Sequence, residues 1–194
     1  MNKKFREMKK ETDLKMKDRK LKRDKDGRVI IQMNVKKDDS FLSEFSENQS
    51  SVISAEVAEF IDNEANSVLP QEELTLQIKN DCIDKQEEKI YTSAIKEYYM
   101  QKYIANEQEI KRNRIISFLL GVVGVFVLIL ELLYAYFIGN PLWSSVIEIV
   151  AWVLLWEATD IGLLETRVLH IKRKRFLAYI YMNIEYLPID KNKI

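Results

Sequence analysis

Four acidic residues interrupt two apolar segments, where carboxyl groups could carry protons or bind cations. Glu131 lies in the first segment, residues 115–138, and the second segment, residues 141–164, contains Glu148, Glu157 and Asp160. An acid in a lipid bilayer costs about 2.5–3.5 kcal/mol on insertion scales. Acids kept in such segments therefore indicate a proton or cation route, or protonated groups that donate hydrogen bonds between helices. Both interpretations stay open on the sequence.

The apolar segments themselves are long enough to cross a membrane as helices. Roughly 20 apolar residues, rising about 1.5 Å each, cross a hydrocarbon core, and each segment has 24 residues. Gly139 and Asn140 separate the two segments, and Pro141 follows, a combination that ends a helix and turns the chain. We expect a hairpin of two transmembrane helices with an outer turn at residues 139–140.

Basic residues flank the hairpin on one side only. Lysine and arginine within about 15–20 residues of a span stay on the cytoplasmic side. Both outer flanks of the hairpin are basic, whereas the turn has no charge; the residues are Lys111, Arg112, Arg114, Arg167, Lys172, Arg173, Lys174 and Arg175. The pattern predicts a multi-pass protein of the plasma membrane with both termini in the cytoplasm.

An antiparallel hairpin brings Glu131 and Glu148 to the same depth, where two carboxylates repel unless they share a proton or a cation. Glu157 and Asp160 share a face nearer the cytoplasm. Glu148 and Glu157 are half a turn apart around the helix, so one partner helix cannot shield both. The acids therefore predict a homo-oligomer or a complex with another membrane protein.

A close approach of two helices is indicated by Ser117 and Gly121, which are four residues apart in the first span. Small residues at this spacing let helix backbones pack tightly in lipid. We take these two residues as a helix-packing site.

The remaining chain predicts a mainly α membrane protein with long cytoplasmic helical extensions and a small N-terminal α+β domain. The alternating pattern of residues 29–35 and of 72–79 is typical of half-buried strands, and residues 54–66 form an amphipathic helix. The predicted order is a basic segment (1–27), the α+β domain (28–83), a long helix (84–114), the hairpin, a basic aromatic helix (165–187) and a tail (188–194).

Catalytic and metal-binding patterns are absent from the sequence. Cys82 and His170 are the only residues of their types and lie far apart along the chain, and there is no glycine-rich phosphate loop. We therefore expect no enzyme, no cofactor, no metal, no small-molecule substrate and no nucleic-acid partner. An enzyme of unfamiliar type would need a ligand in the cytoplasmic domain.

The stretch from Asp84 through the first span, together with EIVAWVLLWEATD at residues 148–160, resembles a group of small two-span proteins of Gram-positive bacteria that have no known activity. The resemblance implies a plasma-membrane protein and carries over no catalytic residues. Two functions follow as hypotheses. The first is a non-enzymatic membrane protein whose cytoplasmic domain binds a partner or self-assembles. The second is an oligomeric pore for ions or protons, as in a stress or defence effector.

Overall fold

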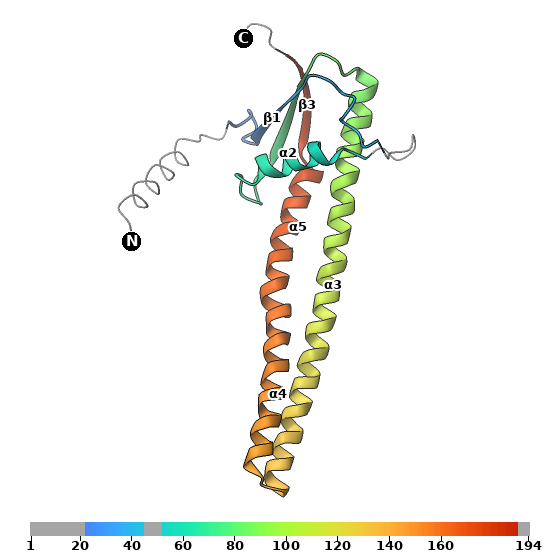
Figure 1. Cartoon of the computed structure of the whole chain (residues 1–194). Helices are drawn as coiled ribbons and strands as arrows, with labels where there is room; N and C mark the ends of the chain where they lie inside the picture. Colours follow the sequence, from blue (N-terminus) through green and yellow to red (C-terminus); the bar gives the residue numbers. More distant parts are fainter. Residues whose placement is uncertain (1–21, 45–51, 190–194) are drawn as a thin grey trace, which may run out of the picture. The chain divides into compact units, whose positions relative to one another are not determined.

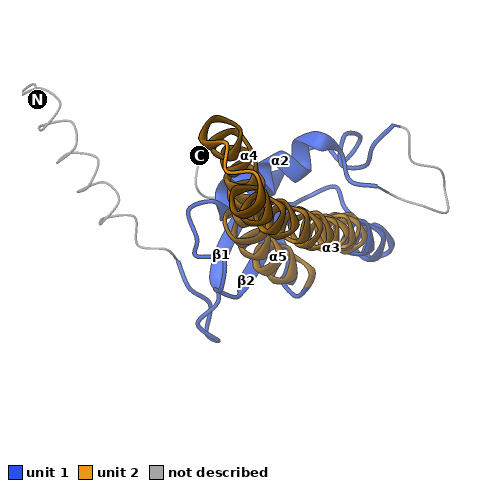
Figure 2. Cartoon of the chain, turned by 90° about the horizontal axis from the view of Figure 1, so that it is seen from below, with its two compact units in different colours: residues 1–94, 181–194 blue, residues 95–180 orange. Residues whose placement is uncertain are grey.

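The computed structural model describes residues 22–44 and 52–189 (Figure 1). The chain divides into two compact units (Figure 2). Unit 1 combines residues 1–94 with residues 181–194, and unit 2 comprises residues 95–180. Most of the basic segment expected at residues 1–27 and most of the tail at 188–194 lie outside the described residues.

A three-stranded parallel sheet lies at the centre of unit 1. Its strands are β1 (Val29–Val35), β2 (Leu74–Asn80) and β3 (Asn183–Pro188), with β2 in the middle. Every second residue of β1 is buried, because successive side chains of a strand point to opposite faces. The structure therefore confirms both strands that the alternating pattern predicts in the N-terminal half.

The third strand corrects the predicted helix over residues 165–187. Helix α5 (Thr166–Ile180) ends at Ile180, and the chain then pairs with β2, so that Ile184 lies opposite Leu76. Side chains from all three strands join across one face: the Gln32 amide donates to Gln77 Oε1 (3.1 Å), and the Gln77 amide donates to Glu185 Oε2 (3.0 Å). This distant pairing, rather than local helical preference, determines the conformation of residues 183–188.

Helix α2 (Ala55–Ala65) connects β1 to β2. Ser54 caps it, because its hydroxyl accepts a hydrogen bond from the Val57 amide at 3.4 Å. The cap therefore forms without the glutamate of a capping box, which Val57 replaces. Ala58, Ile61 and Ala65 point into the core of unit 1.

The first turns of helix α3 (Lys85–Phe137) complete the core of unit 1. Tyr91 and Ala94 are buried there. The Tyr91 ring stacks on Phe41 with 4.4 Å between the centroids, and its hydroxyl donates to Asp38 at 3.3 Å. A unit of three strands and one short helix buries little surface by itself, so it depends on this contribution from α3.

Helix α3 continues without a break into unit 2, as the sequence predicts. Asp84 and Glu87 form a reciprocal capping box at its start, with both hydrogen bonds at 2.8 Å. Of the described helices, α3 is the one long and apolar enough to cross a membrane by length and composition, so one of the two predicted spans is found.

The second arm of unit 2 begins directly after the predicted turn. Gly139 has a φ of +67°, and Asn140 caps helix α4 (Pro141–Thr159) by accepting from the Leu142 amide at 3.2 Å. The arm continues through a π-helical segment, η1 (Asp160–Glu165), into α5.

Alkaline titration tests the packing around Tyr91. Burial, together with the Asp38 and Glu87 carboxylates, raises the pKa of Tyr91 to about 12. The unfolded chain loses this proton near the ordinary value of about 10, so the free energy of unfolding should fall as the pH rises from 10 towards 12. Tyrosinate absorbance should contain a late component that forms above the ordinary pKa, and Tyr91→Phe should reduce it.

Tyr181→Phe is the matched control for this titration, because Tyr181 is exposed, and the late component should survive it. Burial also raises the pKa of Tyr186, so a small part of the late absorbance should remain in Tyr91→Phe. A titration of the folded protein that is complete near the ordinary value of about 10 would contradict the packing.

Candidate functional site

The two arms of unit 2 meet along a stripe of side chains that we call the hairpin seam. Its side chains are small or polar from Asn113 to Gly162 and larger in the part of the hairpin farthest from the turn. On α3 the seam positions are three, four or seven residues apart, the spacing of one helix face in a heptad pattern. They are Tyr99, Asn106, Ile110, Asn113, Ser117, Gly124 and Glu131. The other arm contributes Ser144, Ala151, Ala158, Gly162, Leu169 and Tyr179.

The arms approach most closely around Ser117. Its hydroxyl donates to the carbonyl oxygen of Ala158 at 2.6 Å, and a Cβ added to Gly162 would overlap the Ser117 side chain. A Cβ on Gly124 would lie 2.9 Å from Leu155 Cδ2. Small residues and a side-chain hydrogen bond therefore hold the two backbones together here.

Of the two residues predicted as the helix-packing site, one lies in the contact between the arms. Ser117 is central to the seam, whereas Gly121 lies at its edge, where an added Cβ would meet Ala158 Cβ at an ordinary 3.9 Å. Sequence reasoning missed Gly124 and Gly162, which are the tighter positions. The signal for Gly124 was present, because it follows Ser117 by seven residues, one heptad.

Polar contacts continue along the seam beyond Ser117. The Asn113 amide donates to Glu165 at 3.2 Å, the Asn106 amide donates to the Leu169 carbonyl at 3.1 Å, and Arg173 pairs with Glu107 at 3.3 Å. In these pairs the residue number decreases along α3 as it increases along the other arm. This is the antiparallel order that the sequence predicts. The ring centroids of Tyr99 and Tyr179 are 4.4 Å apart at the end of this series.

The π-helical segment η1 lies opposite Ser117 and contains Gly162. Its wider turn frees a carbonyl from the regular helical pattern, and the Thr166 hydroxyl donates to the Ile161 carbonyl at 2.9 Å. Such segments often occur at functional sites. Here the segment brings the Gly162 backbone against the Ser117 side chain.

The four acids predicted to lie in the membrane are arranged differently from the prediction. Glu131 is buried, with 8% of its side chain exposed, and it accepts a hydrogen bond from the Ser144 hydroxyl. Glu148, expected to face Glu131, is exposed. The seam passes through Ser144 and Ala151, and Glu148 lies beside that stripe rather than in it. The expected facing pair of carboxylates is therefore replaced by a carboxyl–hydroxyl contact.

The other two acids also lie outside the seam. Glu157 is exposed, and Asp160 is half-buried at the start of η1. Since Glu148 and Glu157 are half a turn apart around α4, they flank the seam on opposite sides. Within this single chain, neither carboxylate accepts a hydrogen bond or forms an ion pair among the described residues.

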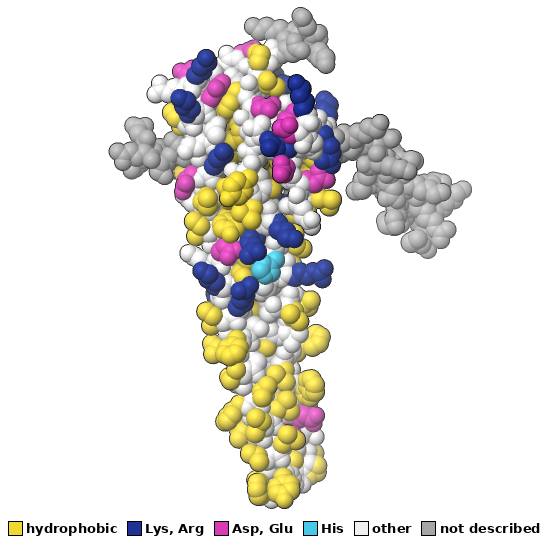
Figure 3. All heavy atoms as spheres, turned by 180° about the vertical axis from the view of Figure 1, so that it is seen from behind, with side chains coloured by type: hydrophobic (Ala, Val, Ile, Leu, Met, Phe, Trp, Pro, Cys, Tyr) yellow, Lys and Arg dark blue, Asp and Glu magenta, His cyan; other side chains and the backbone are white. Residues whose placement is uncertain are grey.

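Large apolar side chains cover the outer surface of the hairpin. Phe118 is 71% exposed on α3, and Leu142 and Trp156 on α4 are 79% and 72% exposed. Figure 3 shows hydrophobic side chains gathered over the part of unit 2 that ends at the turn. The polarity is therefore reversed from that of a soluble helical pair, in which large apolar residues occupy the contact stripe.

The predicted basic flanks lie where the apolar surface ends. Lys111, Arg112 and Arg114 are exposed on α3, and Figure 3 shows a group of lysine and arginine side chains next to the apolar region. On the other arm Arg167, Lys172 and Lys174 are exposed, and Arg173 and Arg175 are half-buried. Cations of both arms therefore border the same end of the apolar surface.

Over the described residues, no group of three or more histidine, cysteine, aspartate or glutamate side chains is arranged to hold a metal ion. Cys82 is exposed, in the loop after β2. No protein-family model, curated protein or solved structure matches the chain. The geometry of the hairpin seam therefore carries the functional argument.

Two glycine substitutions test the seam. Gly162→Ala forces Ser117 to move away from Ala158, so the hairpin should lose about 1–3 kcal/mol, the usual cost of overpacking. Gly121→Ala meets only an ordinary contact and gains helix propensity, so it should be neutral or should stabilise by up to about 1 kcal/mol. All three tryptophans are in α4, and their fluorescence during denaturation in detergent reports both effects. Equal denaturation midpoints for Gly162→Ala and Gly121→Ala would contradict the close approach of the arms at the seam.

Proposed function

We propose that this chain is a non-enzymatic plasma-membrane protein with two transmembrane helices and both termini in the cytoplasm. In this proposal the apolar part of α3 and helix α4 with η1 cross the bilayer. Unit 1 lies on the cytoplasmic side and engages a partner, and copies of the chain assemble through the outer face of α4.

The reversed polarity of the hairpin carries the proposal. In water, an outer surface of phenylalanine, leucine and tryptophan around a polar stripe would be unfavourable, because apolar surface is stabilised by burial. In hydrocarbon the same arrangement is favourable, because polar side chains there need partners within the protein. Helix α4 has this polarity too, since Leu142 and Trp156 are among the most exposed apolar residues.

The acids outside the seam support self-assembly. A carboxyl group facing lipid costs about 2.5–3.5 kcal/mol, and no lysine or arginine lies in residues 115–164 to neutralise one. Glu148 and Glu157 lie on opposite flanks of the seam, so shielding both requires neighbours on two sides. A ring or chain of copies provides such neighbours.

The charge of unit 1 supports a role in binding a partner. Residues 38–88 contain 14 acidic and 2 basic residues. The inner leaflet of the membrane is negatively charged and attracts basic segments, so the acidic stretch of residues 38–88 is repelled from the lipid surface. Complementary charge steers association, which favours a partner with a basic surface.

The assembly is tested by replacing the two outer acids. Hydrogen bonds between membrane helices contribute about 0.6–2 kcal/mol, so Glu148→Leu and Glu157→Leu should each weaken association about 3- to 30-fold. Glu148→Gln and Glu157→Gln retain a donor and should associate nearly as well as the original chain. The measurement is the monomer fraction at increasing dilution in bilayer nanodiscs or liposomes.

Ile129→Leu is the control, because Ile129 is an exposed apolar residue of α3 and not of the α4 face proposed to assemble, and association should not change. Chains that stay monomeric at every density in the bilayer would contradict self-assembly. Leucine variants that associate as well as the original chain would contradict the role of the acids.

Ion flux through liposomes separates this proposal from a pore. The buried Glu131 in the seam is the feature that favours a conducting role, since a titratable group inside a membrane is often part of a proton route. The proposed non-enzymatic membrane protein does not conduct ions, so a pH gradient across proteoliposomes should stay intact. A gradient that collapses, with a pH dependence altered by Glu131→Gln, would establish the pore instead.

A further inference from the structure

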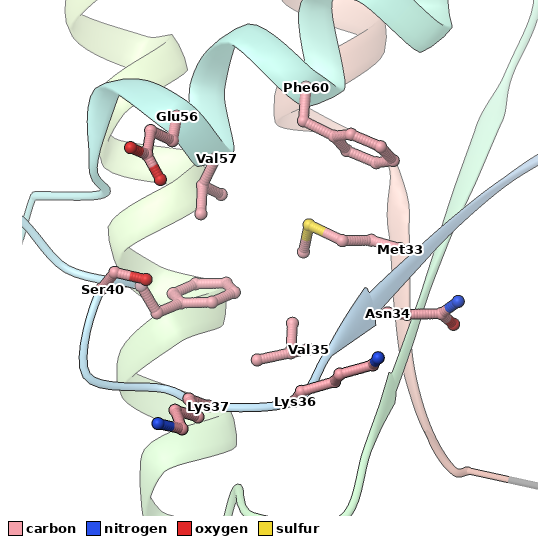
Figure 4. A pocket seen from close by; sticks show the side chains of 10 residues that line it. Met33, Asn34, Val35, Lys36, Lys37, Ser40, Glu56, Val57 and Phe60 are labelled. Atoms are coloured by element: carbon pink, nitrogen blue, oxygen red, sulfur yellow. The ribbon is translucent and has the colours of Figure 1, made fainter.

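Unit 1 contains a pocket of about 240 Å³ between β1 and α2. Met33 and Val35 line it from the strand, Val57 and Phe60 line it from the helix, and the Phe41 ring closes one side. Figure 4 shows the side chains of Met33, Val35 and Val57 pointing toward a common space, with Phe60 beside it. Phe60 remains 36% exposed, so the pocket is open to an entering molecule.

The walls of the pocket are fixed by the fold. Phe41 is buried and stacks on Tyr91, and its backbone carbonyl accepts from the Ser54 amide at 2.9 Å. Tyr91 in turn donates to Asp38. A pocket that keeps its shape without a ligand loses less entropy when a ligand binds.

The pocket lies at the carboxyl end of β1, where the chain leaves the parallel sheet for α2. The apolar lining and the preformed walls are the features that indicate a binding site. Sequence reasoning assigned no ligand to this domain, because the lining residues come from separate elements and have no motif.

The volume and the rim define the kind of ligand. A cavity of roughly 150 Å³ lined by apolar side chains can bind benzene, so this pocket has room for a bicyclic molecule. The Ser40 hydroxyl and the Glu56 carboxylate lie on the same side of the pocket (Figure 4). Both oxygens can accept a hydrogen bond, and the carboxylate makes a donor on the ligand favourable.

A protein side chain fits this site less well than a free molecule. The apolar lining is confined to the pocket, and charged residues surround it, including Lys36, Lys37 and Glu56. The buried centre of a protein–protein interface is depleted in charged residues and wider than one pocket. A small molecule can fill the apolar part of the pocket and leave the charged residues at its rim in water.

We infer that unit 1 binds a small, largely apolar molecule of about bicyclic size that has one hydrogen-bond donor. This inference goes beyond the proposed function, since it requires neither the membrane spans nor self-assembly. Indole is a suitable probe, because it has the size and a single N–H donor.

The experiment follows the methyl resonances of the methionines in the full chain held in nanodiscs, as indole is added. Met33 lines the pocket, so its signal should shift and saturate. Met100 and Met182, outside the pocket lining, are the internal controls and should not shift with it. Because indole also enters lipid, a site-specific signal is needed rather than total binding.

Two comparisons make the result decisive. Val57→Phe fills the pocket and should weaken binding about tenfold or more, equivalent to about 1.4 kcal/mol, whereas Leu69→Phe changes an exposed residue and should not. N-methylindole, which lacks the donor, should bind more weakly than indole. A Met33 signal that does not saturate, or that saturates equally in Val57→Phe, would overturn the inference. Equal affinity for the two probes would overturn the donor requirement.

Discussion

Hydrocarbon provides no hydrogen bonds, and the arrangement of the proposed membrane hairpin follows from this constraint. Each polar side chain in the arms must find a partner inside the protein or on another copy. Ser117 donates to the Ala158 carbonyl, and Glu131 accepts from the Ser144 hydroxyl. These contacts lie on one stripe of each helix, so they also determine the register of the arms and leave the large apolar side chains outside.

The same constraint explains the glycines and the acids. A seam joined by short polar side chains needs backbones that approach closely, and Gly124 and Gly162 permit this approach. The π-helical segment adjusts the second arm where Gly162 meets Ser117. Glu148 and Glu157 fall outside the stripe, and the partners that they need must come from neighbouring copies. Helix packing, local helix geometry and proposed assembly therefore share one cause.

Sequence periodicity predicted much of the fold, because the elements near each other in the chain follow local rules. The capping residues Asp84 and Glu87 and the turn at Gly139 were correct for this reason. The strand after Ile180 was missed because its partner, β2, is about a hundred residues away. The depth of Glu131 and Glu148 was predicted from the turn, but which side of the helix faces the partner depends on packing. The pocket around Met33 could not be predicted, since three separate segments create it.

The accessibility of single cysteines to a membrane-impermeant maleimide tests the central claim most directly. Cys82 is the only cysteine and is exposed; in intact cells it should stay unlabelled until the membrane is permeabilised, as should Tyr181→Cys in a Cys82→Ser background. Ile138→Cys in the same background, next to the turn, should be labelled from outside. Labelling of Cys82 or Tyr181→Cys in intact cells, or protection of Ile138→Cys, would contradict two spans with both ends in the cytoplasm.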